Sequence, residues 1–389
     1  MATEDGGAPV QEPCLYEVEL SRVQVNTNLF TSLVDISNNL LDDYHLKTLS
    51  VNPRNLLYVL TDPVESWSEL SSPNIYCAIE VYLEGKIPNI PVSETLTKTI
   101  RYALAAVPAL ASTPLVIAHI VNLFKREDRS EDYGLKAINI LTSFYNREEA
   151  TAKSTTPEVP LTNLQRKWPR LYYIGVYSDL TTDSLSLWEK YNFSVLFAGQ
   201  MEDPEWLLQD VFNLTPACVM ITTLRDYQLE TAEDKFLSLV SIAEDCQSMF
   251  ITHLSLWRVL DPQVSLRILG NYRKTIPKLV LDLHYPWQES DQTGVEDFLR
   301  QPNKVELKLH LVKKLAQKYF RGSLPFQLSQ DTEVVFLLVG LQHHTIEEAQ
   351  ANLQIERDTV IESLRQSFEM ARDYYNILLP GVSEPSPKR

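Results

Sequence analysis

The segment Leu115-Val116-Ile117-Ala118-His119-Ile120-Val121-Asn122-Leu123-Phe124 leads into the charged turn Lys125-Arg126-Glu127-Asp128-Arg129-Ser130-Glu131-Asp132-Tyr133-Gly134, followed by Leu135-Lys136-Ala137-Ile138-Asn139-Ile140-Leu141. This pattern predicts a buried strand, a tight turn and a helix. Such a turn is where phosphate-bearing cofactors bind, because unpaired backbone N–H groups and the positive end of the helix dipole both face the anion. The carboxylates in this turn would repel an anion. Whether a cofactor fits here therefore depends on the residues around the turn.

The same stretch also raises the possibility of a membrane helix. Residues Tyr102 to Phe124 carry no formal charge over 23 positions, which is long enough to cross a bilayer. Pro108 and Pro114 interrupt the run and leave a short Ala-rich piece before the β-rich piece. We therefore expect a linker followed by a buried strand, and a membrane-tethered adaptor is the alternative.

The neighbouring segments alternate between strand and helix patterns. We expect a polar surface loop over Asn146 to Leu164. Strands are predicted at Leu15–Leu20, Asn55–Thr61, Asn74–Leu83, Leu171–Tyr177, Phe193–Phe197 and Ala217–Thr222, and helices at Asn28–Asp43 and Thr182–Tyr191. Helices between the strands of a mixed sheet indicate an α/β domain over residues 14–226.

From residue 227 the pattern becomes helical. One helix is predicted around Phe236 to Leu254 and another from Val305 to Tyr319, with prolines between them. The chain then forms a helical hairpin, in which Thr345-Ile346-Glu347-Glu348 has the sequence of a capping box. We expect a helical domain over 227–380, and disordered tails at 1–13 and 381–389.

Composition limits the classes of function. The chain has 389 residues, 44% of them hydrophobic, and a net charge of −16, so its overall field repels nucleic acid. Its four cysteines are far apart, which indicates neither a disulfide framework nor a zinc site and suits a reducing compartment. The N-terminal residues lack the features of a signal peptide, so we expect an intracellular protein.

Several motifs in order resemble the RNA cytidine acetyltransferases, which have a GNAT domain followed by a helical region. The sequence Ala78-Ile79-Glu80-Val81-Tyr82-Leu83-Glu84-Gly85 is similar to a family strand ending in Leu-Glu-Gly. The block from Leu171 to Phe193, with Tyr173-Ile174-Gly175-Val176 and Trp188, is similar to a second family motif. Val339-Gly340-Leu341-Gln342-His343-His344-Thr345 is similar to the family's Gly-Leu-Gln-His-Lys-Ser/Thr-Val signature. The resemblance covers residues 14–378 and implies a GNAT-like mixed sheet flanked by helices.

The cofactor turn departs from that family. The family's Gln-Gly-x-Gly-Tyr-Gly falls on residues 129–134, where only Tyr133 and Gly134 match. Ser130 and Asp132 put side chains where glycines would let the backbone approach a pyrophosphate. An Asp about 4 Å from a phosphate charge would cost on the order of 4 kcal/mol at an effective dielectric near 20, or about three decades of affinity. The ATP-binding module of the family is also not found, since no G-x-x-x-x-G-K-[ST] motif occurs in the sequence.

The resemblance implies four cofactor-binding candidates, Arg129, Tyr133, Gly134 and Lys190, the last replacing a family Arg. The alternative is an ordinary strand-to-helix turn with solvated charges. Tyrosines 173, 177 and 191 could serve as general acids, although packing roles are commoner for tyrosines near a sheet. We expect no metal site at His343-His344, because no further ligand lies at a suitable spacing.

One basic patch remains to be explained. Residues 304–321 contain six basic side chains and a single carboxylate, Glu306. The basic residues are Lys304, Lys308, Lys313, Lys314, Lys318 and Arg321. The patch is either a helix that contacts RNA or a solvated helix face.

Together these features favour a non-catalytic GNAT-fold scaffold or binding subunit, acting in RNA modification or ribosome assembly. No cofactor is expected, except acetyl-CoA if the turn is still competent. The alternative is an active acetyl-CoA-dependent acyltransferase acting on RNA cytidine or a protein amine. Protein partners in a ribonucleoprotein or ribosome-assembly complex are expected, as is a possible dimer with itself or a full-length paralogue. The resemblance favours the nucleus or nucleolus, with the mitochondrion or cytoplasm as alternatives.

Overall fold

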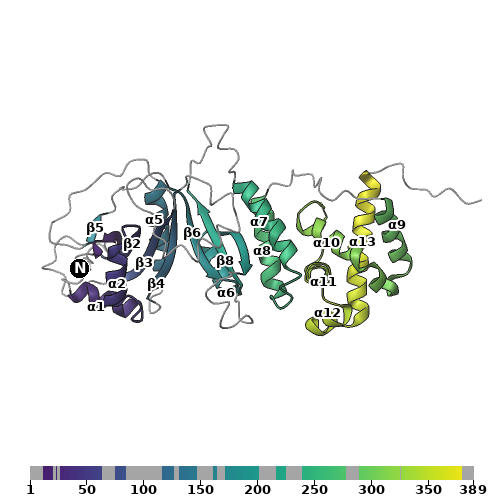
Figure 1. The fold of residues 1–389 in the computed structure, drawn as a ribbon, viewed down its shortest axis with the longest axis horizontal. Helices are drawn as coiled ribbons and strands as arrows, with labels where there is room; N and C mark the ends of the chain where they lie inside the picture. The colour runs from purple at the N-terminus through teal and green to yellow at the C-terminus, as the bar shows by residue number, and fades with distance from the viewer. Residues whose placement is uncertain are drawn as a thin grey trace, which may run out of the picture.

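The structure is a computed structural model that describes residues 12–20, 23, 27–63, 75–84, 116–126, 131–146, 161–163, 171–200, 216–224, 239–276, 289–324 and 326–378. A mixed sheet with flanking helices makes up the first half, and helices make up the second (Figure 1). The predicted fold class is thereby confirmed. The predicted domain boundary at 226/227, the N-terminal tail up to residue 11 and the tail at 381–389 lie outside the described residues.

The sheet has eight strands in the order β5-β1-β2-β3-β4-β6-β8-β7. All neighbouring strands are antiparallel except β4 and β6, which are parallel. The strands are β1 Cys14–Val18, β2 Asn55–Thr61, β3 Ile75–Glu84, β4 Val116–Lys125, β5 Leu161–Asn163, β6 Leu171–Asp179, β7 Ser194–Gln200 and β8 Pro216–Thr223. The parallel pair β4 and β6 lies near the middle of the sheet, and there the antiparallel alternation of strand directions is interrupted.

Two predictions in this half need correction. The single helix expected over Asn28–Asp43 is two helices, α1 Thr27–Ile36 and α2 Asp43–Val51. Between the two helices, Asn38 and Asn39 have positive φ angles of 51° and 67°. Asparagine tolerates this left-handed conformation, but an α-helix cannot continue through it. The surface loop expected over Asn146–Leu164 contains the short edge strand β5, paired with β1.

Both faces of the sheet are covered. Along β2, Leu56, Tyr58 and Leu60 face the larger core, whereas Leu57 and Val59 face a smaller core beneath α1 and α2. This is the two-residue alternation of a strand buried on both sides. The larger core includes helices α5 Tyr133–Asn146 and α6 Thr182–Lys190.

The larger core continues into the helical half, because α7 Leu239–His253 and α8 Pro262–Thr275 pack against β7. The remaining helices are α9 Glu289–Arg300, the 3₁₀ helix η4 Pro302–Lys308, α10 Leu309–Phe320, α11 Gln330–Gly340, α12 Ile346–Leu353 and α13 Arg357–Leu378. The capping box at Thr345 and Glu348 is confirmed. Pro262, expected to interrupt structure, instead occupies the first turn of α8 behind the N-cap Asp261.

The uncharged run of residues 102–124 does not give a membrane helix where it is described. Its final part, from Val116, belongs to strand β4, and residues 102–115 lie outside the described residues. Among the helices that the structure describes, none has the length and hydropathy needed to span a bilayer.

Candidate functional site

The two parallel strands at the centre of the sheet separate toward their carboxyl ends. Their pairing runs from Val116 and Leu171 to Ile120 and Val176. Beyond that point β4 continues to Lys125 without pairing to β6, which stays paired with β8 up to Asp179. In open α/β sheets, ligands bind in the crevice at such carboxyl ends. The candidate site is therefore this opening, with the N-terminus of α5 beside it.

A β-bulge lies where the strands separate. Glu80 of β3 pairs with Asn122 and Val81 pairs with Ile120, so Val121 is an extra residue in β4 and is 38% exposed. The buried Glu80 carboxylate accepts a hydrogen bond from Asn122 Nδ2 at 2.7 Å, and His45 Nε2 of α2 lies 3.3 Å from it. This polar cluster fixes the bulge in register, and sequence reasoning did not identify it.

The N-terminus of α5 is capped by the protein's own carboxylate. Asp132 Oδ1 accepts hydrogen bonds from the Leu135 amide at 3.1 Å and from the Tyr191 hydroxyl at 3.0 Å. Asp132 Oδ2 accepts one from Lys190 Nζ at 2.5 Å. Lys190 ends α6 and Tyr191 follows it. The Asp132 carboxylate therefore accepts hydrogen bonds both from α5, through the Leu135 amide, and from the end of α6. A negative charge therefore already occupies the end of the helix where an external anion would bind.

The electrostatics stabilise this closed arrangement. Burial alone would raise the pKa of the Asp132 carboxyl, but hydrogen bonds from Lys190, from the Leu135 amide and from Tyr191 outweigh burial, and the pKa lies below its ordinary value. Burial raises the pKa of Tyr191, and its bond to Asp132 raises it further. Near neutral pH the pair is thus a carboxylate that accepts and a phenol that donates.

Gly134 shows how little room remains above the turn. A Cβ atom at this position would lie 2.9 Å from the Tyr191 hydroxyl and 3.3 Å from Asp132 Oδ1. The polar atoms over the first turn of α5 are thus supplied by the chain itself.

The structure brings together three of the four predicted cofactor residues, Tyr133, Gly134 and Lys190, and Arg129 lies outside the described residues. Tyr133 stacks on Tyr76 with ring centroids 4.5 Å apart, so its ring packs against the start of β3. Of the tyrosines considered as acids, Tyr173 is buried in the core and Tyr191 closes the turn.

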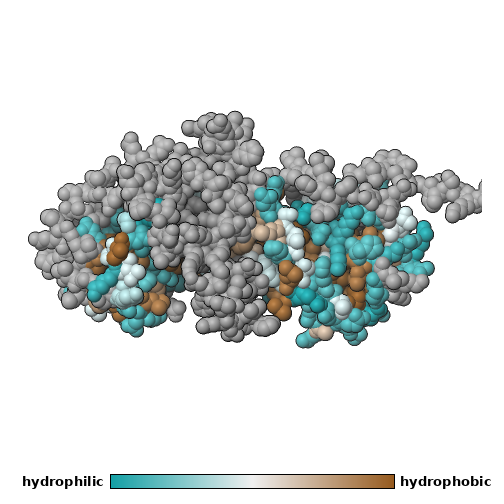
Figure 2. Space-filling model, in the orientation of Figure 1, coloured by the Kyte–Doolittle hydropathy of each residue, from teal (hydrophilic) through white to brown (hydrophobic). Residues whose placement is uncertain are grey.

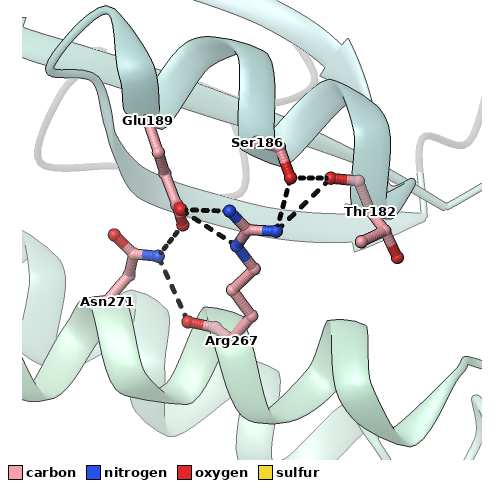
Figure 3. A network of polar contacts seen from close by, with 5 residues as sticks. All are labelled: Thr182, Ser186, Glu189, Arg267 and Asn271. Carbon is pink, nitrogen blue, oxygen red and sulfur yellow. Dashed lines mark hydrogen bonds and ion pairs between the residues drawn. The ribbon is translucent and has the colours of Figure 1, made fainter.

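A polar network joins α6 to α8 (Figure 3). Arg267 donates to one oxygen of Glu189 from Nε at 2.9 Å and from Nη2 at 2.6 Å, and to Ser186 Oγ at 2.7 Å. Asn271 Nδ2 donates to the other Glu189 oxygen at 2.7 Å. Burial would raise the pKa of Glu189, but Arg267 and Asn271 lower it below the ordinary value. Because Glu189 precedes Lys190, this network ties the helical half to the segment that closes the turn.

A shallow groove of about 580 Å³ borders this network. It is lined by the start of α6, the first turns of α8 and the start of α11, through Thr182, Gln263, Val264, Leu266, Arg267, Leu328, Gln330 and Glu333. Glu333 is already engaged by Arg273 Nη1 at 3.0 Å and by the Tyr319 hydroxyl at 2.7 Å. The groove therefore offers few charged groups to a ligand.

The basic patch does not form one solvated face. Lys308 Nζ lies 3.5 Å from an Asp297 oxygen, Lys314 pairs with Asp291, and Lys318 is only 5% exposed. Arg321 donates to Ser248 Oγ at 3.0 Å, and Lys313 is half-buried. The side chain of Lys304 lies outside the description. RNA binding by this patch stays a prediction, weakened by the carboxylates beside two of its lysines.

Comparison with known proteins confirms the resemblance seen in the motifs. No protein-family model matches the chain. RNA cytidine acetyltransferases 2 and 1 of Arabidopsis thaliana are 23% and 25% identical over 86% and 85% of this chain. RNA cytidine acetyltransferase of Dictyostelium discoideum is 21% identical over 83% of it. The chain spans only 36% to 37% of the length of these relatives.

Among solved structures, Arabidopsis thaliana NAA60 in complex with acetyl-CoA overlaps 55% of this chain and 98% of its own, with a TM-score of 0.31 and 8% identity. Because that TM-score is low, the fold assignment depends on the strand order and the sequence relatives instead.

Proposed function

We propose that this relative of the RNA cytidine acetyltransferases is a non-catalytic binding subunit, in which the chain's own charges close the cofactor turn. The observation that supports this most directly is the carboxylate of Asp132, held over the N-terminus of α5 by Lys190 and Tyr191. An arrangement that satisfies its own charges has no need of an external anion.

The energetic argument follows from the same contacts. A phosphate placed about 4 Å from Asp132 would meet a repulsion on the order of 4 kcal/mol at an effective dielectric near 20. To avoid it, Asp132 must leave Lys190, Tyr191 and the Leu135 amide, and those three donors lose their acceptor. Either route lowers cofactor affinity by roughly three decades.

The biological setting that we propose follows from the relatives, which are named for the acetylation of RNA cytidine. The chain would act beside such an enzyme, in RNA modification or ribosome assembly, and the nucleus or nucleolus is the corresponding compartment. Binding of a protein partner, rather than chemistry at the α5 turn, would be its contribution.

Calorimetric titration with acetyl-CoA and with CoA tests the proposal. We expect no measurable heat from the unaltered protein at ligand concentrations up to about 1 mM, and a gain of roughly a hundredfold or more in affinity for Asp132→Gly, which removes the charge and bares the backbone. Asp373→Asn, an exposed carboxylate on α13, is the matched control. Binding by the unaltered protein with a Kd below about 100 μM would refute a closed turn.

A second function is supported by one specific observation, the separation of β4 and β6 beside the bulge at Val121. That opening favours an acetyl-CoA-dependent acyltransferase acting on RNA cytidine or a protein amine. Transfer of a labelled acetyl group to cytidine-containing RNA or to a protein amine would support it, and Gly134→Glu should abolish that transfer. If acetyl transfer survives Gly134→Glu, the α5 turn is not the cofactor site of that activity.

A further inference from the structure

The edge of β4 that faces β6 is left open in the middle of the sheet. The two strands pair only up to Ile120 and Val176. Beyond these residues β4 continues to Lys125 and β6 to Asp179, and in the part of the chain that the structure describes no further strand lies between them. An open strand edge presents N–H and C=O groups with which another strand can pair. This space is the β4–β6 slot.

The hydrogen bonds between β3 and β4 show which residues of β4 face the slot. Directly after β4, the Arg126 amide donates to the Tyr76 carbonyl oxygen of β3 at 3.2 Å. In an antiparallel ladder, hydrogen-bonded pairs alternate with pairs that do not bond to each other. In the register of these strands, Phe124 therefore bonds to β3, whereas Leu123 and Lys125 do not. The N–H and C=O groups of Leu123 and Lys125 point into the slot.

The polar groups of these two residues repeat at the spacing of an extended polypeptide. Residues two apart in a strand are roughly 7 Å apart, and the main-chain amides of a paired strand have the same repeat. Two paired strands lie about 4.8 Å apart, so a strand between two others needs about 9.6 Å. The slot is closed at Ile120 and Val176 and opens toward Lys125 and Asp179. An inserted segment therefore enters from the open end and has a small residue at its inner end.

The closed end of the slot is held in shape by polar contacts. The Glu80 carboxylate accepts a hydrogen bond from Asn122 Nδ2 at 2.7 Å and lies 3.3 Å from His45 Nε2, which fixes the bulge in β4. Val121, the extra residue of the bulge, is 38% exposed, and Tyr177 of β6 is half-buried. These two follow the last paired residues of their strands, so they place apolar side chains at the closed end. Because the edge is ordered in advance, pairing with it costs less conformational entropy.

Other classes of ligand suit the slot less well. Asp179, at the open end, is exposed, and the whole chain has a net charge of −16, so the phosphates of RNA are repelled. Figure 2 shows that hydrophobic residues of the described surface form small separate areas among hydrophilic ones on the face in view. A partner that binds by broad apolar contact would have little to cover there. Main-chain pairing needs neither a charged patch nor a broad apolar one.

We propose that the β4–β6 slot receives an extended segment of a partner protein, which pairs through its main chain with Leu123 and Lys125. This deepens the proposed function, because it rests on the chain acting as a binding subunit. Strand addition at a sheet edge gains affinity from main-chain hydrogen bonds and specificity from alternate side chains. The segment has a small residue at its inner end and an apolar residue beside Val121 and Tyr177.

Hydrogen exchange of the free protein tests the open edge first. The amides of Leu123 and Lys125 should exchange roughly a hundredfold faster than the Phe124 amide, which bonds to β3. Nuclear magnetic resonance measures the three amides individually in the full chain. Equal protection of all three would mean that a segment of this chain already pairs with β4, and the proposal would fail.

Site-specific cross-linking in the protein's own cells then identifies the partner segment. A photoreactive diazirine amino acid replaces Val121, and mass spectrometry identifies the cross-linked peptide. A synthetic peptide of that sequence, added to the full chain, should slow exchange of the Leu123 and Lys125 amides roughly tenfold or more. A cross-link to RNA, to CoA or to a second copy of this chain, or no cross-link at all, would overturn the proposal. So would a peptide that binds without slowing these two amides.

An amide-to-ester replacement in the main chain gives the quantitative test. At Leu123 it removes the N–H group that points into the slot and keeps the side chain, so the synthetic peptide should bind roughly tenfold more weakly. The matched control is the same replacement at Tyr44, whose N–H group in the first turn of α2 has no partner within the helix. Equal peptide affinity of the Leu123 ester and the unaltered protein would contradict main-chain pairing.

The same measurements separate this proposal from the closed cofactor turn. If acetyl-CoA binds the unaltered protein while the peptide still slows exchange at Leu123 and Lys125, the turn proposal fails and the slot proposal stands. If acetyl-CoA does not bind and the peptide leaves both amides unchanged, the closed turn stands and the slot proposal fails.

Discussion

Two segments that resemble the same family differ in what they have kept. The turn before α5 has lost glycines, and its side chains now bind one another through Asp132, Lys190 and Tyr191. The segment 340–345 has kept its glycine and glutamine: Gly340 lies against α10, and Gln342 donates to the carbonyls of Trp257 and Leu260 in the loop between α7 and α8. Residues that hold neighbouring elements together are retained in the second segment, whereas the glycines that would expose a bare backbone are replaced in the first.

The largest expected effect concerns Gln342. Gln342→Leu keeps the size of the side chain but removes the two hydrogen bonds to the carbonyls of Trp257 and Leu260, leaving both without their donor. Each such loss costs roughly 1–3 kcal/mol, so we expect the free energy of unfolding to fall by about 3 kcal/mol in urea denaturation. Gln327→Leu, at an exposed position, should stay within about 0.5 kcal/mol of the unaltered protein. Equal values for the two variants would contradict the role given to Gln342.

The next largest effect on stability compares alanine substitutions at Gly340 and Gly134. A Cβ on Gly340 would lie 2.4 Å from Ala316 Cβ and 3.3 Å from the Val312 carbonyl oxygen, so α10 and α11 would have to move apart. Gly340→Ala should therefore destabilise the fold by about 2 kcal/mol. A Cβ on Gly134 would meet side-chain atoms, the Tyr191 hydroxyl at 2.9 Å and Asp132 Oδ1 at 3.3 Å, so Gly134→Ala should cost less than about 1 kcal/mol. Thermal unfolding of both variants makes the comparison, and a larger loss for Gly134→Ala would reverse it.

A smaller effect is expected between α6 and α8. The Glu189–Arg267 pair is partly buried and has two N–H groups on one oxygen, so a double-mutant cycle of Glu189→Gln and Arg267→Gln should give a coupling energy of about 1.5 kcal/mol. The exposed pair Arg372–Asp373 should give less than about 0.5 kcal/mol in a parallel cycle. Coupling no larger than that of the surface pair would mean that the network does not hold the two halves together.

Local patterns in the sequence predicted much of this fold. The apolar run and the helical spacing around residue 132 predicted β4 and α5, because strand and helix periodicity are properties of neighbouring residues. Helices α8 and α9 were missed since the prolines around them were interpreted as interruptions. Pro262 in fact begins α8, and only the N-cap contact of Asp261 reveals this.

The site was harder to predict, because its contacts are distant in sequence. Resemblance identified Gly134 and Lys190 as neighbours of a cofactor, but Lys190 binds Asp132, which lies 58 positions away. Arg267 and Glu189 are 78 positions apart, and no motif marks either residue. The basic patch likewise depended on Asp291 and Asp297 of α9, whose positions beside the lysines no local pattern indicates.

The smallest expected effect tests the charge state of the closed turn. Because the pKa of Asp132 is lowered in the folded protein, its stabilising contribution is fully present above its ordinary value of 3.8 and is lost as the pH falls through the lower folded value. Asp132→Asn should therefore cost about 1 kcal/mol at pH 7, and the difference between the two proteins should shrink as the pH is lowered below about 4. Urea unfolding across this range measures it, with Asp373→Asn as the control that stays flat. A difference that is constant with pH would show that the Asp132 carboxylate does not carry the charge that closes the turn.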